Sequence, residues 1–224
     1  MEDIFDNIVR SQGFTNYLFL FTAIVGVIQF KKFKEISIRC FIIAFAYLAL
    51  SDYLSLFYGR TVGGGSNSIV FNISYIVSFT ALFYVFHAHI ENKYFRAFIK
   101  IMFGVYVLLV FIDIFFLKID YNIEYQAWPY VIGGITVLLS VLFYFYEVLN
   151  SEKLIALERN MIFWIAFGHF FYFLAKVPLV VRKNLYVSDS SYHPLLITLN
   201  EVMTMILCVS LIIGFLWSRP RLKN

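Results

Sequence analysis

Four charged side chains lie at a similar depth inside long apolar stretches of the sequence, where a charge is costly. They are Asp52, Asp113, Lys176 and Glu201, each in a different stretch. At about 1.5 Å per helical residue, each lies roughly 6–10 Å from the same end of the bundle that these stretches would form. Ionisable groups inside membrane helices commonly mark a ligand site or an ion pathway. We therefore expect these side chains to meet in one polar pocket.

Smaller polar residues accompany two of these charges. Ser55 follows Asp52 by three residues, on the same helix face, and Asn200 directly precedes Glu201. We expect Lys176 to pair with Glu201 or with Asp52. Three acids and one base leave an excess of negative charge, which suits a cationic ligand, an ion or at least one protonated acid.

Two structural interpretations of the same charges stay open. The acids and the lysine could form a buried ion-pair network that only fixes how the helices pack. Asp113 and Lys176 could also reach the lipid headgroups with their side chains and take no part in a pocket.

A second group of polar residues extends away from the predicted pocket. His169 lies near the middle of its apolar stretch, and Tyr172 follows on the same helix face. His87 and Glu147 lie near the opposite end of their stretches. These four residues could relay protons or contact a partner. The alternative is a histidine bonded to a neighbouring helix, with polar anchors at the membrane surface.

No catalytic or metal-binding motif accompanies these residues. His87 and His89 are two residues apart, so they point to different sides of a helix and cannot bind one ion together. No H-E-x-x-H spacing occurs, and the glycines at 63–65 are not followed by the lysine of a phosphate loop. We expect no metal, cofactor or catalytic residue, although acids alone could support a hydrolase.

Seven apolar stretches must position these side chains. The chain has 224 residues and is 61% apolar and 14% charged, whereas soluble domains are about 45–50% apolar and about 25% charged. Each stretch has the roughly 20 residues that a helix needs to span a bilayer. We predict an all-α polytopic membrane protein, a seven-transmembrane-helix bundle forming one domain over 1–224, with helices at 14–30, 40–58, 69–90, 97–117, 129–149, 160–181 and 194–217.

Lysine and arginine predict the orientation. Twelve of them flank the loops on one side of the predicted membrane, and five flank those on the other. Because cytoplasmic loops carry the excess of basic residues, the N-terminus is predicted outside and the C-terminus in the cytoplasm. The net charge of +4 follows from these loops, so we expect the lipid bilayer as a partner and no nucleic acid.

The function that fits best is a sensor or regulatory module of the bacterial cytoplasmic membrane. We expect an outward-facing pocket for a small-molecule or cationic ligand, and a separate cytoplasmic or membrane protein as the partner that carries the output. In topology the chain resembles the seven-helix sensor regions at the front of some bacterial membrane receptors. A small-solute or ion transporter or channel, an intramembrane acid-dependent hydrolase, and an accessory or effector protein of a bacterial defence locus are the alternatives. The oligomeric state stays open.

Overall fold

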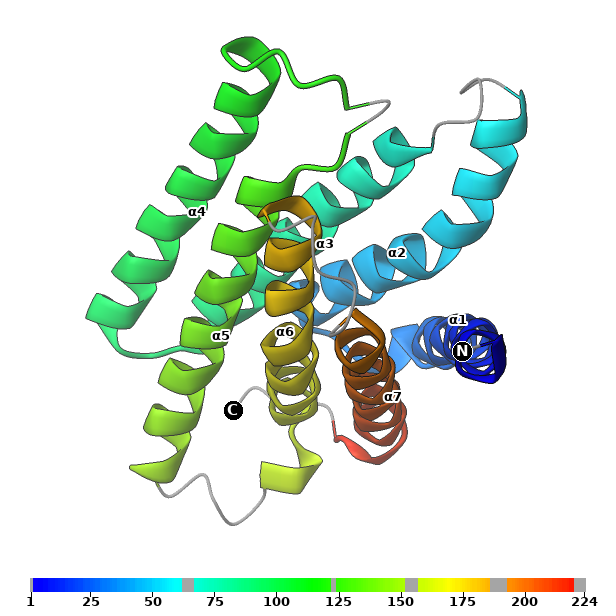
Figure 1. Cartoon of the computed structure of the whole chain (residues 1–224). Coiled ribbons are helices and arrows are strands. Elements are labelled where there is room, and N and C mark those ends of the chain that lie inside the picture. Colours follow the sequence, from blue (N-terminus) through cyan, green and yellow to red (C-terminus); the bar gives the residue numbers. More distant parts are fainter. Residues whose placement is uncertain (1, 62–66, 122–123, 152–156, 186–192, 220–224) are drawn as a thin grey trace.

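The computed structural model describes residues 2–61, 67–121, 124–151, 157–185 and 193–219, and the regular elements in them are all helices (Figure 1). This confirms the predicted all-α class. A short 3₁₀ turn, η1 (Phe30–Lys32), follows the first helix. The α-helices are α1 (Glu2–Ile28), α2 (Ile36–Thr61), α3 (Ser68–His89), α4 (Lys93–Phe115), α5 (Ala127–Leu149), α6 (Met161–Leu185) and α7 (His193–Trp217).

Six of these helices, α2 to α7, are long and apolar enough to cross a membrane. In α1 the apolar part covers Gly13–Ile28 and is shorter than the apolar part of each of the other six helices. The ends of α2 to α7 lie within four residues of the predicted ends, whereas α1 begins 12 residues before its predicted start. Lys153, Arg221 and Lys223, which enter the count of basic residues, lie outside the described residues.

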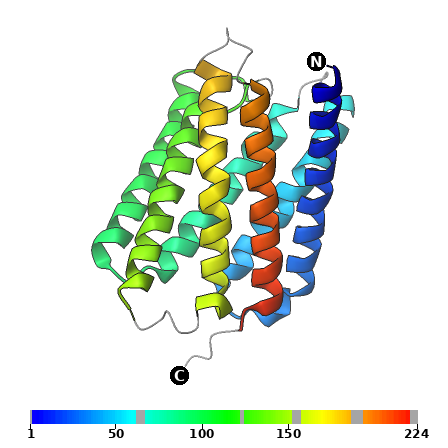
Figure 2. The same ribbon diagram turned by 60° about the horizontal axis from the view of Figure 1, so that its bottom comes forward.

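The helices form a ring with one helix outside it. Around the ring α1 contacts α2, α2 contacts α3, α3 contacts α5, α5 contacts α6, α6 contacts α7, and α7 returns to α1. α4 packs on the outside against α3 and α5, and stands at the edge of the bundle in Figure 1. α1 begins at one end of the bundle, and α7 ends at the other (Figure 2). We call the end at which α1 begins the first end and the opposite end the second end.

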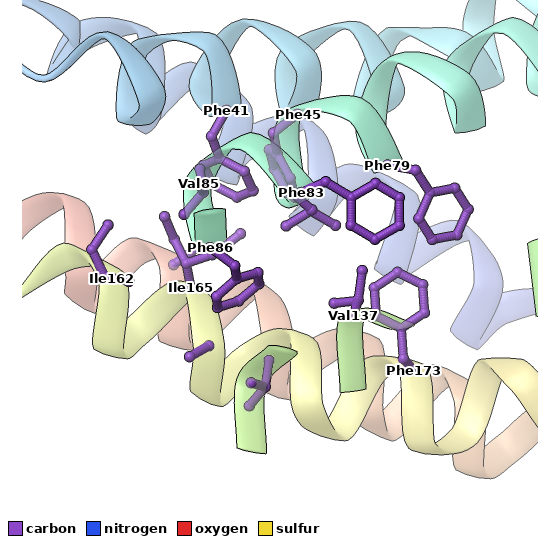
Figure 3. Close-up of a cluster of buried hydrophobic side chains, with 14 of the residues drawn as sticks. Phe41, Phe45, Phe79, Phe83, Val85, Phe86, Val137, Ile162, Ile165 and Phe173 are labelled. Carbon is purple, nitrogen blue, oxygen red and sulfur yellow. The ribbon is translucent and has the colours of Figure 1, made fainter. Parts of the chain in front are cut away.

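The centre of the ring is filled by aromatic and branched side chains. Phe79 of α3 stacks on Phe173 of α6 with ring centroids 5.6 Å apart (Figure 3). Val137 of α5 and Ile165 of α6 are fully buried members of the same cluster. Helix pairs in a membrane associate through close packing of this kind, because lipid offers no hydrophobic gain for burying one apolar surface on another.

Polar contacts tie the helix ends together. The ammonium of Lys32 donates to the carbonyl oxygens of Phe215 and Leu216, at 2.7 and 2.9 Å, and so joins the α1–α2 connection to the last turn of α7. At the first end, Asn72 of α3 is fully buried. Its amide donates to the carbonyls of Tyr121 and Glu124 and accepts from the backbone of Gln126, fixing the α4–α5 connection to α3.

Candidate functional site

A cavity of about 180 Å³ lies inside the ring, in the half nearer the first end. Five helices, α1, α2, α3, α6 and α7, contribute to its wall. Four of the residues predicted to form a pocket line it together: Asp52, Lys176, Asn200 and Glu201. Asn16 of α1, which is exposed, also lines the cavity and connects it with the surface of the protein.

Two buried oxygen atoms in this wall have no hydrogen-bond partner. Asn200 and Glu201 are each 8% exposed, and neither Oδ1 of Asn200 nor Oε2 of Glu201 receives a hydrogen bond. Buried polar atoms are nearly always paired, and an unpaired one costs about 1–3 kcal/mol. α7 therefore carries two unsatisfied acceptors on residues that line the cavity.

Lys176 of α6 does not make the direct pair that we predicted. Its ammonium lies within 4 Å of no carboxylate oxygen of the described residues, so the expected contact with Glu201 or Asp52 is absent there. Lys176 still interacts electrostatically with Asp52 across the cavity. Asp52, Lys176 and Glu201 therefore line a common cavity and do not form a closed network of ion pairs.

Hydroxyl groups around the cavity add further acceptors. Ser51 donates its proton to the carbonyl of Leu48, and Thr204 donates to the carbonyl of Asn200, which leaves both oxygens with lone pairs to spare. Ser55 is buried one turn beyond Asp52 and donates to the carbonyl of that residue. Ser55 thus supports the backbone of α2 and does not line the cavity.

Asp113 lies apart from this cavity. It belongs to α4, the helix outside the ring, and the hydroxyl of Tyr121 donates to its Oδ2 atom at 3.4 Å. Burial raises the pKa of Tyr121, and the neighbouring Asp113 carboxylate raises it further, so this hydroxyl keeps the proton that it donates. Equal depth did not imply a common site, because depth says nothing about the side of the helix on which a residue lies.

His169 and Tyr172 of the predicted relay line a second, much smaller cavity of about 30 Å³. Tyr172 and Tyr75 line both cavities, so the small one continues the polar one toward the middle of the bundle. Nδ1 of His169 bonds the carbonyl of Ile165 at 2.8 Å, and Ser78, whose buried hydroxyl has no partner, lies in the same wall. A space of this size holds a water molecule.

His87 and Glu147 have other surroundings. Both oxygens of the Glu147 carboxylate accept backbone N–H groups just before α4, from Glu91 at 2.8 Å and from Asn92 at 2.7 Å. A carboxylate at the start of a helix stabilises it, so this contact has a structural role. His87 faces a groove between α3 and α4, on the outside of the ring.

Some residues of these sites carried no clear signal in the sequence. Tyr75 of α3 looked like one more aromatic packing residue, and Asn16 of α1 looked like the edge of an apolar stretch.

At the second end, Nε2 of His89 contacts the carboxylate of Glu35, while its Nδ1 bonds the carbonyl of Val85. The short connections that bring Glu35 and His89 to one end were visible in the sequence, but their contact was not.

The acceptors of the central cavity suit a donor or a cation. Within the described ranges, no group of three His, Cys, Asp or Glu side chains is placed to hold a metal ion. Comparison with models of protein families, with curated proteins and with solved structures finds no match to this chain. The function is therefore inferred from the chemistry of the cavity.

Proposed function

We propose that this chain is a seven-span sensor or regulatory module of the bacterial cytoplasmic membrane. In this proposal the first end faces outward, and the central cavity binds a small cationic ligand from that side. A separate protein on the cytoplasmic side or within the membrane carries the output.

One observation carries the proposal: the two unpaired acceptors on α7. Oδ1 of Asn200 and Oε2 of Glu201 are buried at a cavity that the carboxylate of Asp52 also lines. With all groups ionised, Asp52, Glu201 and Lys176 give the cavity a formal charge of −1. A bound monocation or protonated amine would balance this charge.

The size of the cavity narrows the class of ligand. Pockets for drug-sized molecules have about 300–1,000 Å³, and this one has about 180 Å³. An ammonium ion with a few carbon atoms, or a partly hydrated alkali cation, matches this volume. Large peptides and sugars do not.

The course of the helices favours sensing over transport. Many transporters bind their substrate near the middle of the membrane, between helices that are broken there. In the described residues, α6 and α7 line the cavity as continuous helices, and α6 continues past Pro178. A continuous helix that carries ligand contacts at the first end and reaches the second end can transmit a small displacement.

The orientation rests on the basic residues and on α1. In the sequence, twelve lysines and arginines flank the loops predicted on the side of the second end, and five flank those on the side of the first. This difference favours a cytoplasmic second end. α1 has 27 residues and is about 40 Å long, enough to cross the bilayer even though its apolar part is shorter. As the seventh span it would contribute Thr15 and Asn16 to the cavity from the outer side.

Thermal unfolding in lipid nanodiscs tests the binding site. The chlorides of methylammonium, tetramethylammonium, sodium and potassium are compared at equal ionic strength. We expect at least one cation to stabilise the protein by about 2.7 kcal/mol at 100 times its Kd. Asp113→Asn, a buried acid outside the cavity, should respond in the same way, and Glu201→Gln should not respond.

Three outcomes would count against the proposal. If no cation shifts the unfolding temperature, or if Glu201→Gln responds like the unmodified protein, the cavity is not the binding site. Uptake of the stabilising cation into proteoliposomes would favour the transporter alternative over the sensor.

A further inference from the structure

A groove of about 360 Å³ runs between α3 and α4 on the outside of the ring. Phe83, Ile99 and Phe103 form its floor and walls, and its surface consists almost entirely of carbon. Because α4 packs outside the ring, this groove faces the surroundings of the bundle. In a membrane those surroundings are lipid.

Basic groups gather at the end of the groove that lies toward the second end. Lys100 and His87 line the groove itself, and neither side chain makes a hydrogen bond or ion pair with the described residues. Lys93 and Arg96 precede Lys100 by seven and four residues, so all three lie on one face of α4. All three are exposed, and no acidic side chain lines the groove.

The depth of these groups matches the level of lipid headgroups. Lys100 lies seven residues beyond the start of α4, which corresponds to about 10 Å along the helix. A lysine at this depth extends its ammonium back to the membrane surface while its carbon chain stays against apolar neighbours. Phe83 and Phe103 lie deeper, at the level of acyl chains.

We propose that this groove binds one anionic phospholipid from the leaflet at the second end. Lys100 donates to the phosphate, Arg96 and Lys93 balance the remaining negative charge, and one acyl chain lies against Phe83 and Phe103. The choice of an anionic lipid follows from charge complementarity, since the amine of a zwitterionic headgroup would find no acid in the groove. The site is independent of the central cavity and of which side of the membrane the second end faces.

A fluorescent reporter in the groove tests this inference. Phe103→Trp places an indole among the proposed acyl contacts. The protein is reconstituted in nanodiscs that contain a small fraction of phosphatidylglycerol or phosphatidylcholine with brominated acyl chains, which quench a nearby indole. The signal of the protein without the substitution is subtracted to remove Trp128, Trp164 and Trp217.

We expect brominated phosphatidylglycerol to quench the Phe103→Trp signal at least threefold more than brominated phosphatidylcholine at equal content. Adding Lys100→Gln should abolish that preference, and Lys100→Arg should retain it. Lys34→Gln removes an exposed lysine in the α1–α2 connection, outside the groove, and should leave the preference unchanged.

Three results would overturn the inference. Equal quenching by the two lipids would show that the groove is an ordinary lipid-facing surface. A preference that survives Lys100→Gln would assign the charge selection to another part of the protein. Absence of quenching by either lipid would show that no lipid chain occupies the groove.

Discussion

Glu201 combines two properties that conflict in the absence of a ligand: it is buried, and one of its carboxylate oxygens has no partner. An uncompensated buried charge destabilises a protein. We therefore predict that Glu201→Gln raises the free energy of unfolding of the ligand-free protein by about 1–2 kcal/mol. Thermal unfolding in nanodiscs without added small amines measures this change.

Asp113→Asn is the matched control for this prediction. Asp113 is also a buried acid, but it accepts a hydrogen bond from Tyr121. Its replacement should leave stability unchanged or lower it. A lower unfolding temperature for Glu201→Gln would mean that Glu201 supports packing and that the cavity is not kept open for a ligand.

Residue type and depth identified the charged residues of the central cavity from the sequence. Asp52, Lys176 and Glu201 stand out because charges are rare in apolar stretches. The sequence could not show which side of each helix faces the ring, and for that reason Asp113 was grouped with them. It also could not show that Lys176 stands apart from both acids, since that depends on side-chain positions across three helices.

The α3–α4 connection depends on a residue from a third helix, Glu147 of α5. We predict that Glu147→Ala removes two charge-assisted hydrogen bonds and costs about 1–3 kcal/mol. Hydrogen exchange should locate the loss, with amides of Glu91 and Asn92 exchanging at least tenfold faster. Glu158, an exposed residue of the α5–α6 connection, provides the control. Glu158→Ala should leave the exchange rates of these two amides unchanged. Unaltered exchange in Glu147→Ala would leave the relay interpretation as the better one.

Two glycines allow a matched test of helix packing. A Cβ atom on Gly168 of α6 would lie 3.2 Å from Cα and 3.3 Å from the carbonyl oxygen of Leu207 in α7, whereas one on Gly104 of α4 would meet nothing within 4 Å. Gly168→Ala should push α6 from α7, lower the unfolding temperature and weaken cation binding, because both helices line the cavity.

Gly104→Ala, in contrast, should be neutral or stabilise the protein by up to about 1 kcal/mol, the usual gain from alanine inside a helix. Thermal unfolding and cation titration of both variants give the comparison. Equal effects of the two substitutions would mean that the close contact of α6 with α7 adds nothing to the cavity.

The sequence predicted where most helices begin and end, but it did not predict which helices pack against each other. Charged groups such as Glu91 to Arg96 interrupt apolar stretches and so mark where α3 ends and α4 begins. α1 extends beyond its apolar part because polar residues also form helices, which an apolar count does not detect. That α4 stands outside the ring depends on side-chain shapes along α3 and α5, which no periodicity encodes.

The whole molecule presents apolar side chains around its circumference, as a protein in lipid must. Exposed examples come from helices on every side of the bundle: Phe21, Ile43, Leu108, Leu142 and Val209. We predict that an expressed form without native cysteines, carrying Lys118→Cys in the α4–α5 connection, reacts in intact cells with a maleimide that cannot cross membranes.

The same experiment with Lys34→Cys should give labelling only after the cells are opened. Both lysines are exposed, so accessibility within the protein does not limit either reaction. The reverse pattern would invert the proposed orientation. Labelling of both sites in intact cells would mean that the three helices between them, α2, α3 and α4, do not place them on opposite sides of the membrane as proposed.

The position of Lys32 has a consequence for how the protein is made. Contacts among α2, α3, α4 and α5 join helices that are one or two places apart along the chain. The ring closes only when α7 reaches α1 and Lys32 bonds the carbonyls of Phe215 and Leu216. The central cavity takes Asn16 from α1 and Asn200 and Glu201 from α7, so it is among the last features to appear during synthesis. A molecule that binds there would therefore act on finished chains only, and would raise the yield of folded protein without assisting the earlier steps of membrane insertion.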